Sequence, residues 1–85
     1  MKKNSIKPKT THLPILIEQD EDNMYIISCP TFKGCYSQGK NEEEALANIK
    51  EVISICIEEL ATKHKAPQNR FIGFRELEFP IMKRA

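Results

Sequence analysis

The chain has 85 residues, a formal net charge of +1 and 40% hydrophobic residues. This length leaves room for one small domain, and the composition is typical of a folded globular protein, which excludes a disordered chain. The near-zero charge argues against a dedicated nucleic-acid binder, which usually carries a strong basic excess. The longest apolar runs are too short to span a membrane, and no apolar segment of the signal-peptide type follows the basic N-terminus. We therefore expect a cytoplasmic protein that does not act on membranes.

The charges are unevenly distributed along the chain. Residues 1–12 contain four lysines and no acidic residue, whereas residues 42–59 contain six glutamates and one lysine. We interpret residues 1–12 as a flexible basic tail and residues 13–82 as a single domain.

The first half of this domain predicts three short strands. The apolar run at residues 13–19 is the first, residues 24–29 are the second, and the acidic connector between them has the length of a hairpin turn. Pro30 ends the second strand, Gly34 suits a tight turn, and residues 35–38 form a short third strand. Gly39 then allows the chain to change direction.

A long amphipathic helix is predicted to follow. Asn41 is a good N-cap, and Glu44 can return a hydrogen bond to the backbone at the cap. Apolar residues then recur every three or four positions and form one face, at Ala45, Leu46, Ile49, Val52, Ile53, Cys56, Ile57 and Leu60. We expect His64 and Lys65 near the helix end and Pro67 to stop it.

The segment after the helix predicts a fourth, imperfect strand. Residues 71–79 alternate apolar and polar side chains toward their end, and Gly73 could mark a bulge. The predicted fold class is α+β, in which an antiparallel sheet and one helix form a two-layer β-β-β-α-β sandwich.

The three cysteines, Cys29, Cys35 and Cys56, do not form a metal-binding or disulfide pattern. A catalytic pair of Cys35 and His64 is conceivable, but both residues have simpler structural roles at a strand start and a helix end. We expect no catalytic residue, no metal site and no cofactor, and hence a protein that is not an enzyme.

The stretch from Pro30 to Glu51 is the most specific feature of the sequence, and it resembles the HicB antitoxin family. The matching positions combine a strand ending in proline, a Gly-Cys turn, a second glycine, a helix start and Glu-Ala, at Pro30, Gly34, Cys35, Gly39, Glu44, Ala45, Asn48 and Ile49. Asn41 stands at the helix cap, where the family usually has Thr or Ser, and it can cap the helix in the same way. Thr31 and Lys33 depart from the pattern in the loop, where an acidic residue and a proline are common. The resemblance implies a fold like a truncated ribonuclease-H sheet.

The resemblance also implies a function in a toxin–antitoxin system. The expected partner is a HicA-type toxin, a small basic ribonuclease that cuts messenger RNA with a histidine, which the antitoxin would cover. Many proteins of the family add a C-terminal DNA-binding module, and only about 20 residues follow the helix here, so DNA binding through this chain alone is not expected.

From their charge and expected exposure, six residues are candidates for partner binding. Four are acidic and lie on or near the first hairpin, and two are aromatic and flank the Gly34 turn, at Glu18, Asp20, Glu21, Asp22, Phe32 and Tyr36. A solvated hairpin tip is the simpler interpretation of the acidic residues. Two other functions remain open: a stand-alone oligomer, a dimer or tetramer joined through open sheet edges, and a weak nucleic-acid binder using the lysine-rich tail.

Overall fold

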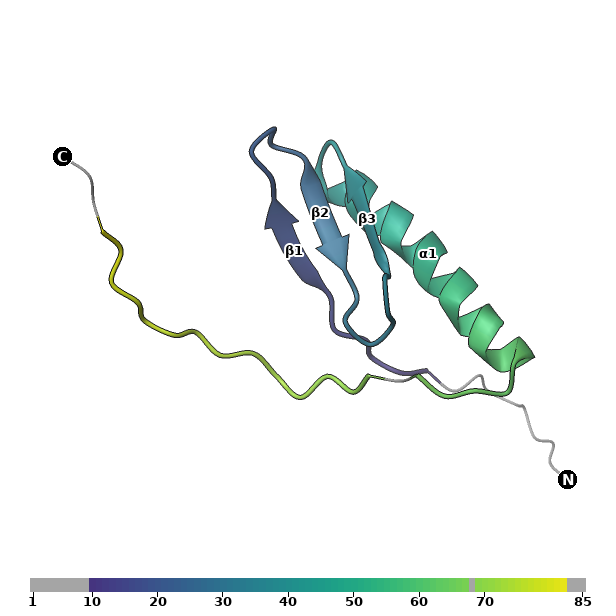
Figure 1. Cartoon of the computed structure of the whole chain (residues 1–85). Helices are drawn as coiled ribbons and strands as arrows, with labels where there is room; N and C mark the ends of the chain where they lie inside the picture. Colours follow the sequence, from purple (N-terminus) through teal and green to yellow (C-terminus); the bar gives the residue numbers. More distant parts are fainter. Residues whose placement is uncertain (1–9, 68, 83–85) are drawn as a thin grey trace, which may run out of the picture.

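The computed structural model describes residues 10–67 and 69–82. It contains β1 (Leu16–Gln19), β2 (Tyr25–Ser28), β3 (Tyr36–Gly39) and α1 (Glu42–Thr62), in this order. The strands form one antiparallel sheet in the order β1-β2-β3, and α1 lies across one face of it (Figure 1). The predicted α+β class, with three antiparallel strands followed by one long helix, is confirmed. The predicted basic tail, residues 1–12, lies largely outside the described residues.

The hairpin between β1 and β2 is closed by one carboxylate. The backbone amide of Asp20 donates to the carbonyl of Met24, and the Asp20 carboxylate accepts the amides of Asp22 and Met24, each at 2.9 Å. Asn23 has a φ of 66°, the left-handed conformation that asparagine tolerates better than most residues. A three-residue loop with a left-handed last residue is a common hairpin connection.

The start of α1 is capped as the sequence predicts. The Asn41 side chain accepts the amide of Glu44 at 2.8 Å, and the Glu44 carboxylate accepts the amide of Lys40 at 2.6 Å. Three glutamates in the first turn complement the positive end of the helix dipole.

The helix ends earlier than the sequence predicts. His64, with φ 54°, turns the chain into the left-handed region, and its amide bonds to the carbonyl of Ala61 while the amide of Lys65 bonds to that of Leu60. This pair of bonds is a Schellman motif, which terminates α1 before Pro67 is reached.

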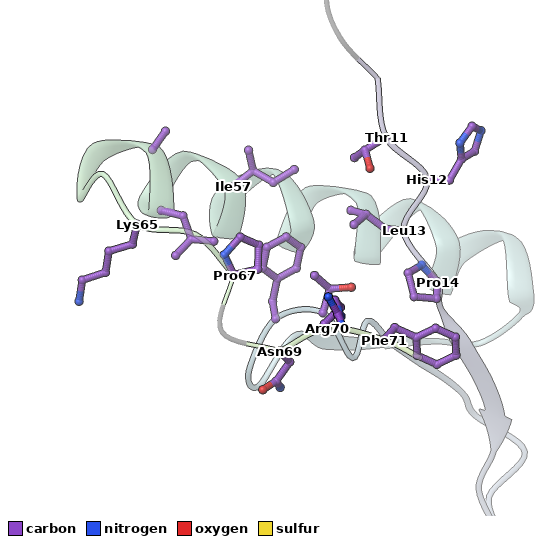
Figure 2. Close-up of a pocket in the computed structure, with 14 residues that line it drawn as sticks. Thr11, His12, Leu13, Pro14, Ile57, Lys65, Pro67, Asn69, Arg70 and Phe71 are labelled. Atoms are coloured by element: carbon purple, nitrogen blue, oxygen red, sulfur yellow. The ribbon is translucent and has the colours of Figure 1, made fainter. Parts of the chain in front are cut away.

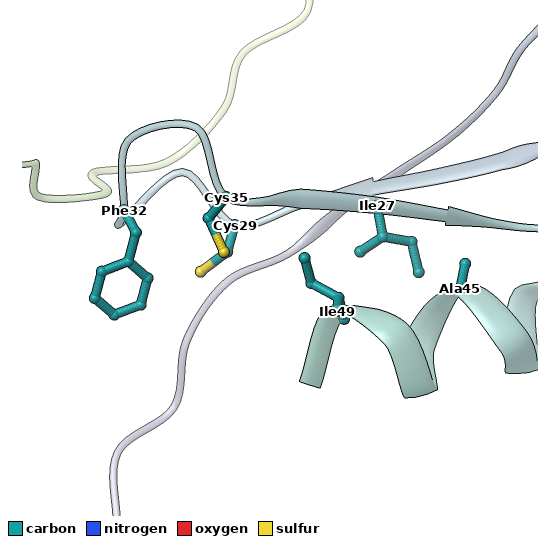
Figure 3. Packing of buried hydrophobic residues seen from close by; sticks show 6 residues of the cluster. All are labelled: Ile27, Cys29, Phe32, Cys35, Ala45 and Ile49. Atoms are coloured by element: carbon teal, nitrogen blue, oxygen red, sulfur yellow. The ribbon is translucent and has the colours of Figure 1, made fainter. Parts of the chain in front are cut away.

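The core lies between α1 and the inner face of the sheet. Ile27 and Cys29 from β2 and the following turn pack with Cys35 and Phe32, and Ala45 and Ile49 of α1 close the other side (Figure 3). The helix packs on β3 and β2 but not on β1. Because β1 is not covered, its inward-facing Ile17 is 45% exposed.

The predicted fourth strand does not form within the chain. Residues 71–79 are not assigned to a strand; after Phe71, which is partly buried, they run away from the sheet as an extended segment (Figure 1). The alternating pattern identified an extended backbone correctly, but no strand of the same chain pairs with it. The helix's apolar face is otherwise as predicted, except that Ile57 is 47% exposed.

Candidate partner-binding surface

The face of the sheet opposite α1 is not covered by any helix or strand of the described residues. Ile27 points toward α1, so by alternation its neighbours Ile26 and Ser28 point the other way. The register then places their cross-strand partners on the same side. We call this surface the open sheet face; it comprises Leu16, Glu18, Ile26, Ser28, Tyr36 and Gln38.

The open sheet face combines apolar and acidic groups. Leu16 and Tyr36 lie in one cross-strand row with Ser28 between them, and they are 42% and 64% exposed. Glu18 lies in the next row beside Ile26 and is exposed. A large aromatic side chain next to apolar and charged groups is a composition that protein interfaces favour.

The acidic hairpin residues divide into two groups. Glu18, Glu21 and Asp22 are exposed, and none of their carboxylates accepts a hydrogen bond among the described residues. Asp20 is partly buried, and its carboxylate is occupied by two backbone amides. The structure thus gives Asp20 a role in holding the turn, which the sequence pattern alone did not separate from the other acids.

The expectation that Phe32 is exposed was wrong. Phe32 is only 9% exposed and packs in the core cluster, because its amide bonds to the carbonyl of Cys29 and this turn folds the ring inward (Figure 3). Tyr36, on the other side of Gly34, is exposed as expected. The two aromatic residues that flank the turn therefore lie on opposite faces of the sheet layer.

The residues of the Pro30–Glu51 motif hold β3 against the helix. A Cβ atom at Gly39 would stand 2.5 Å from the amide nitrogen of Ala45, so only glycine permits this close approach. The Ser37 hydroxyl donates to the carbonyl of Ala45 at 3.0 Å, and the Asn48 amide donates to the carbonyl of Gln38 at 2.9 Å. Gly34 has a φ of 65° in the turn, as predicted. Ser37 was the residue that sequence reasoning missed.

Cys56 of α1 lies beside Cys29 and Cys35, which flank the turn before β3. Burial, followed by the neighbouring Cys56 and Cys29 thiols, raises the pKa of the Cys35 thiol from 9.0 to about 12. All three thiols are free. A thiol with this pKa is protonated at neutral pH and is a poor nucleophile, so the geometry does not favour a catalytic Cys35. Among the described residues, no group of side chains is arranged to hold a metal ion.

A groove of about 980 Å³ opens at the far end of the core. It lies between the last turns of α1, residues 11–14 and residues 65–67 and 69–71. Its walls are mainly apolar, with Leu13, Pro14, Phe32, Ile57, Leu60 and Phe71 (Figure 2). The groove exists because α1, with 21 residues, extends well beyond strands of four residues each.

Comparison with known proteins decides the family. Residues 13–73 match the family model of the HicB-like antitoxins of bacterial toxin–antitoxin systems. The chain belongs to the HicB-like antitoxin family. The resemblance predicted from residues Pro30 to Glu51 is therefore confirmed, and the match extends through both hairpin strands and past the helix.

Several curated relatives support this membership. A UPF0150 protein of Synechocystis is 43% identical over 63 residues, which cover 74% of this chain and 87% of that protein. A UPF0150 protein of Archaeoglobus fulgidus is 34% identical over 75% of this chain and 88% of its own length. A third, from Thermoplasma acidophilum, is 48% identical over 54% of this chain and 67% of its own. UPF0150 proteins belong to the same family.

No solved structure matches the chain. In the part of the HicB-like chain that the structure describes, α1 is too polar to be a membrane-spanning helix.

Proposed function

We propose that this HicB-like protein is an antitoxin that binds a small, basic, mRNA-cleaving toxin of the HicA type and neutralises it by protein–protein contact. Membership of the HicB-like antitoxin family supports an antitoxin role and implies a toxin partner. In this proposal the antitoxin has no catalytic activity and no cofactor, acts in the cytoplasm, and blocks the toxin by covering its catalytic histidine and RNA-binding surface.

The open sheet face is the observation that carries this proposal. It is a surface of apolar and acidic side chains on a rigid sheet, left uncovered by the helix and the strands of the described residues. Tyr36 and Leu16 supply apolar contact area, and Glu18 supplies the charge that a basic partner would recognise. The exposed tip acids Glu21 and Asp22 continue this acidic surface along the hairpin.

The six predicted partner-binding residues take different parts in the proposal. Glu18, Glu21, Asp22 and Tyr36 would contact the toxin directly. Asp20 would act indirectly by fixing the hairpin turn. Phe32 would act from within the core by holding the loop that precedes Tyr36.

The first test is the capture of the toxin by the tagged, full-length chain from its native cells, with bound proteins identified by mass spectrometry. A small basic protein recovered in stoichiometric amount, which cleaves messenger RNA when alone and stops when the chain is added, is the expected result. Recovery of no such protein, or of one whose RNA cleavage the chain does not inhibit, would contradict the antitoxin role.

Two charge reversals then locate the surface. Glu18→Lys, on the open sheet face, should weaken toxin binding at low salt, because it places a like charge against a basic partner. Glu51→Lys makes the same charge change on the exposed side of α1 and should leave binding almost unchanged. Equal effects of the two variants would indicate general electrostatic attraction and remove the open sheet face from the site.

A second candidate function, a stand-alone oligomeric module without a toxin, is favoured by one separate observation. Residues after the helix expose six large apolar side chains, which suit contact between copies of the chain. Recovery of the chain alone in the capture experiment, in a complex larger than a monomer, would support this function. Nucleic-acid binding through the lysine-rich residues 2–9 stays a prediction, because these residues lie outside the described part of the chain.

A further inference from the structure

The extended segment at residues 72–82 exposes an unusually large apolar surface to water in the isolated chain. It carries six large apolar side chains, each more than 70% exposed: Ile72, Phe74, Leu77, Phe79, Ile81 and Met82. Soluble proteins rarely leave so many such groups in water unless another surface covers them. We call residues 72–82 the C-terminal arm.

The second half of the arm has the pattern of a strand with one buried face. Leu77, Phe79 and Ile81 alternate with Glu76 and Glu78, so in an extended backbone the apolar side chains share one side and the acids share the other. Such a strand requires a sheet edge with apolar side chains beside it.

The outer edge of β1 offers this edge. Asp20 bonds to Met24 in the ladder with β2, and hydrogen-bonded pairs alternate along antiparallel strands, so the backbone groups of Ile17 and Gln19 point away from β2. No strand of the described residues pairs with them. The other edge, at β3, is partly occupied, because Asn48 donates to the outward carbonyl of Gln38.

The inner face of β1 also has room for the arm's apolar side chains. The helix covers β2 and β3 but not β1, and Ile17, which points to the helix side, is 45% exposed. Leu77, Phe79 and Ile81 placed beside β1 on this side would extend the apolar layer and cover Ile17.

Pro80 determines the direction in which the arm can pair. In an antiparallel pair, residues on the same face as Ile17 direct their backbone toward β1, so Leu77 and Phe79 would bond to β1 and Pro80 would face outward. In a parallel pair with the same apolar side facing the helix, the backbone groups of Glu76, Glu78 and Pro80 would instead point toward β1. Proline has no N–H to donate to β1. The apolar pattern and Pro80 together favour antiparallel pairing.

This direction excludes a simple return of the arm onto its own β1. The arm begins at Phe71, which lines the groove together with Pro14 just before β1, so it would run alongside β1 in the same direction (Figures 1 and 2). Such pairing is parallel. A second copy can present its β1 in the opposite direction.

We propose that two copies of this chain exchange their C-terminal arms, and that each arm adds an antiparallel strand to the outer edge of the other copy's β1. The exchange is reciprocal, so the contact is symmetric and closes as a dimer. It buries the arm and the uncovered side of Ile17, and it leaves the open sheet face accessible. The inference is independent of toxin binding.

The first experiment measures the mass of the full chain by sedimentation equilibrium. We expect a dimer, and we expect the double variant Leu77→Asp/Phe79→Asp to weaken dimerisation at least about 100-fold, because four apolar side chains leave the interface. The matched control Glu76→Lys/Glu78→Lys changes the other side of the same strand and should remain a dimer. A monomeric parent chain, or equal weakening by both double variants while circular dichroism shows that each is folded, would overturn the proposal.

The second experiment identifies which copy receives the arm. A photoreactive benzoylphenylalanine replaces Phe79, and ¹⁴N- and ¹⁵N-labelled chains are unfolded together, refolded and irradiated. Cross-links from position 79 to residues 15–19 that join a light peptide to a heavy one are expected. Cross-links confined to chains of one label would show that the arm pairs within its own chain, and cross-links to other segments would place it elsewhere; either result contradicts the exchange.

Discussion

Ile17 and Ile27 lie directly opposite each other on neighbouring strands and point toward the same side of the sheet, yet Ile27 is fully buried and Ile17 is 45% exposed. The difference arises because α1 covers β2 and not β1. The core of the single chain therefore ends between these two residues: it includes Ile27 of β2 and leaves Ile17 of β1 outside.

This asymmetry predicts different costs for the same truncation. In the Leu77→Asp/Phe79→Asp background, where the arm is not exchanged, Ile27→Ala should lower the free energy of unfolding by about 2–5 kcal/mol, as expected for a buried isoleucine. Ile17→Ala should cost less than about 1.5 kcal/mol, since half of its side chain is already in water. Urea titration followed by circular dichroism measures both values, and similar losses would show that β1 is covered in the monomer.

Gly39 and Gly34 are both required by the fold, but for different reasons. Gly39→Ala should destabilise the protein by about 2–3 kcal/mol, because the new Cβ would collide with the backbone of Ala45. Gly34→Ala meets no atom within 4 Å and should cost only about 1 kcal/mol, the penalty for a left-handed residue with a side chain. Thermal unfolding of the two variants compares them directly; a larger loss for Gly34→Ala would contradict the close approach of β3 to α1.

His64 occupies a position that glycine fills better. With φ at 54° it carries the steric cost of a left-handed side chain in the Schellman motif. His64→Gly should therefore raise the free energy of unfolding by about 0.5–1 kcal/mol. The neighbouring Lys63, with φ at −91°, provides the control, because Lys63→Gly gains no such relief and should lower stability. A loss of stability in both variants would show that His64 makes a contact that outweighs its backbone cost.

The Cys35 thiol should be unreactive in the folded protein and should make stability depend on alkaline pH. Its pKa is about 12 when folded and near 9.0 when unfolded, so above pH 9 the unfolded chain releases a proton that the folded chain retains. The contribution of Cys35 is complete below pH 9 and is lost as pH rises toward 12.

Two measurements check this behaviour. Cys35 should react with a disulfide reagent at pH 8 only at the rate of unfolding, and the fall in stability between pH 9 and 10.5 should be shallower in Cys35→Ala than in the parent chain. Rapid labelling of Cys35 in the folded protein would show that its thiol is accessible and ionised.

The sequence predicted the elements well where local chemistry determines them. Asn41 and Glu44 mark the helix start through side chains that reach the backbone, and Gly34 marks a turn that needs a positive φ. The helix end was misplaced because α1 is terminated by the left-handed His64, three residues before Pro67. Histidine is more common in this conformation than most non-glycine residues, but the signal is weaker than that of a glycine or a proline.

The candidate site was only partly predictable, because exposure depends on packing between distant segments. Phe32 and Tyr36 flank the same turn and look alike in sequence, but one lies under the loop and the other on the open sheet face. The fourth strand predicted from the alternation of residues 71–79 was wrong for the single chain, which has no strand after α1 in its described part, because an alternating pattern does not by itself supply a strand to pair with.

In the acidic hairpin turn, the residues that fix the shape of the turn differ from those that expose free carboxylates. The geometry of the turn depends on one carboxylate and on Asn23, whereas the side chains of Glu21 and Asp22 bond to nothing in the described structure. Residues 21 and 22 can therefore change without loss of the hairpin's shape. Under the proposed function, partner specificity could therefore diverge at the hairpin tip without a change of scaffold.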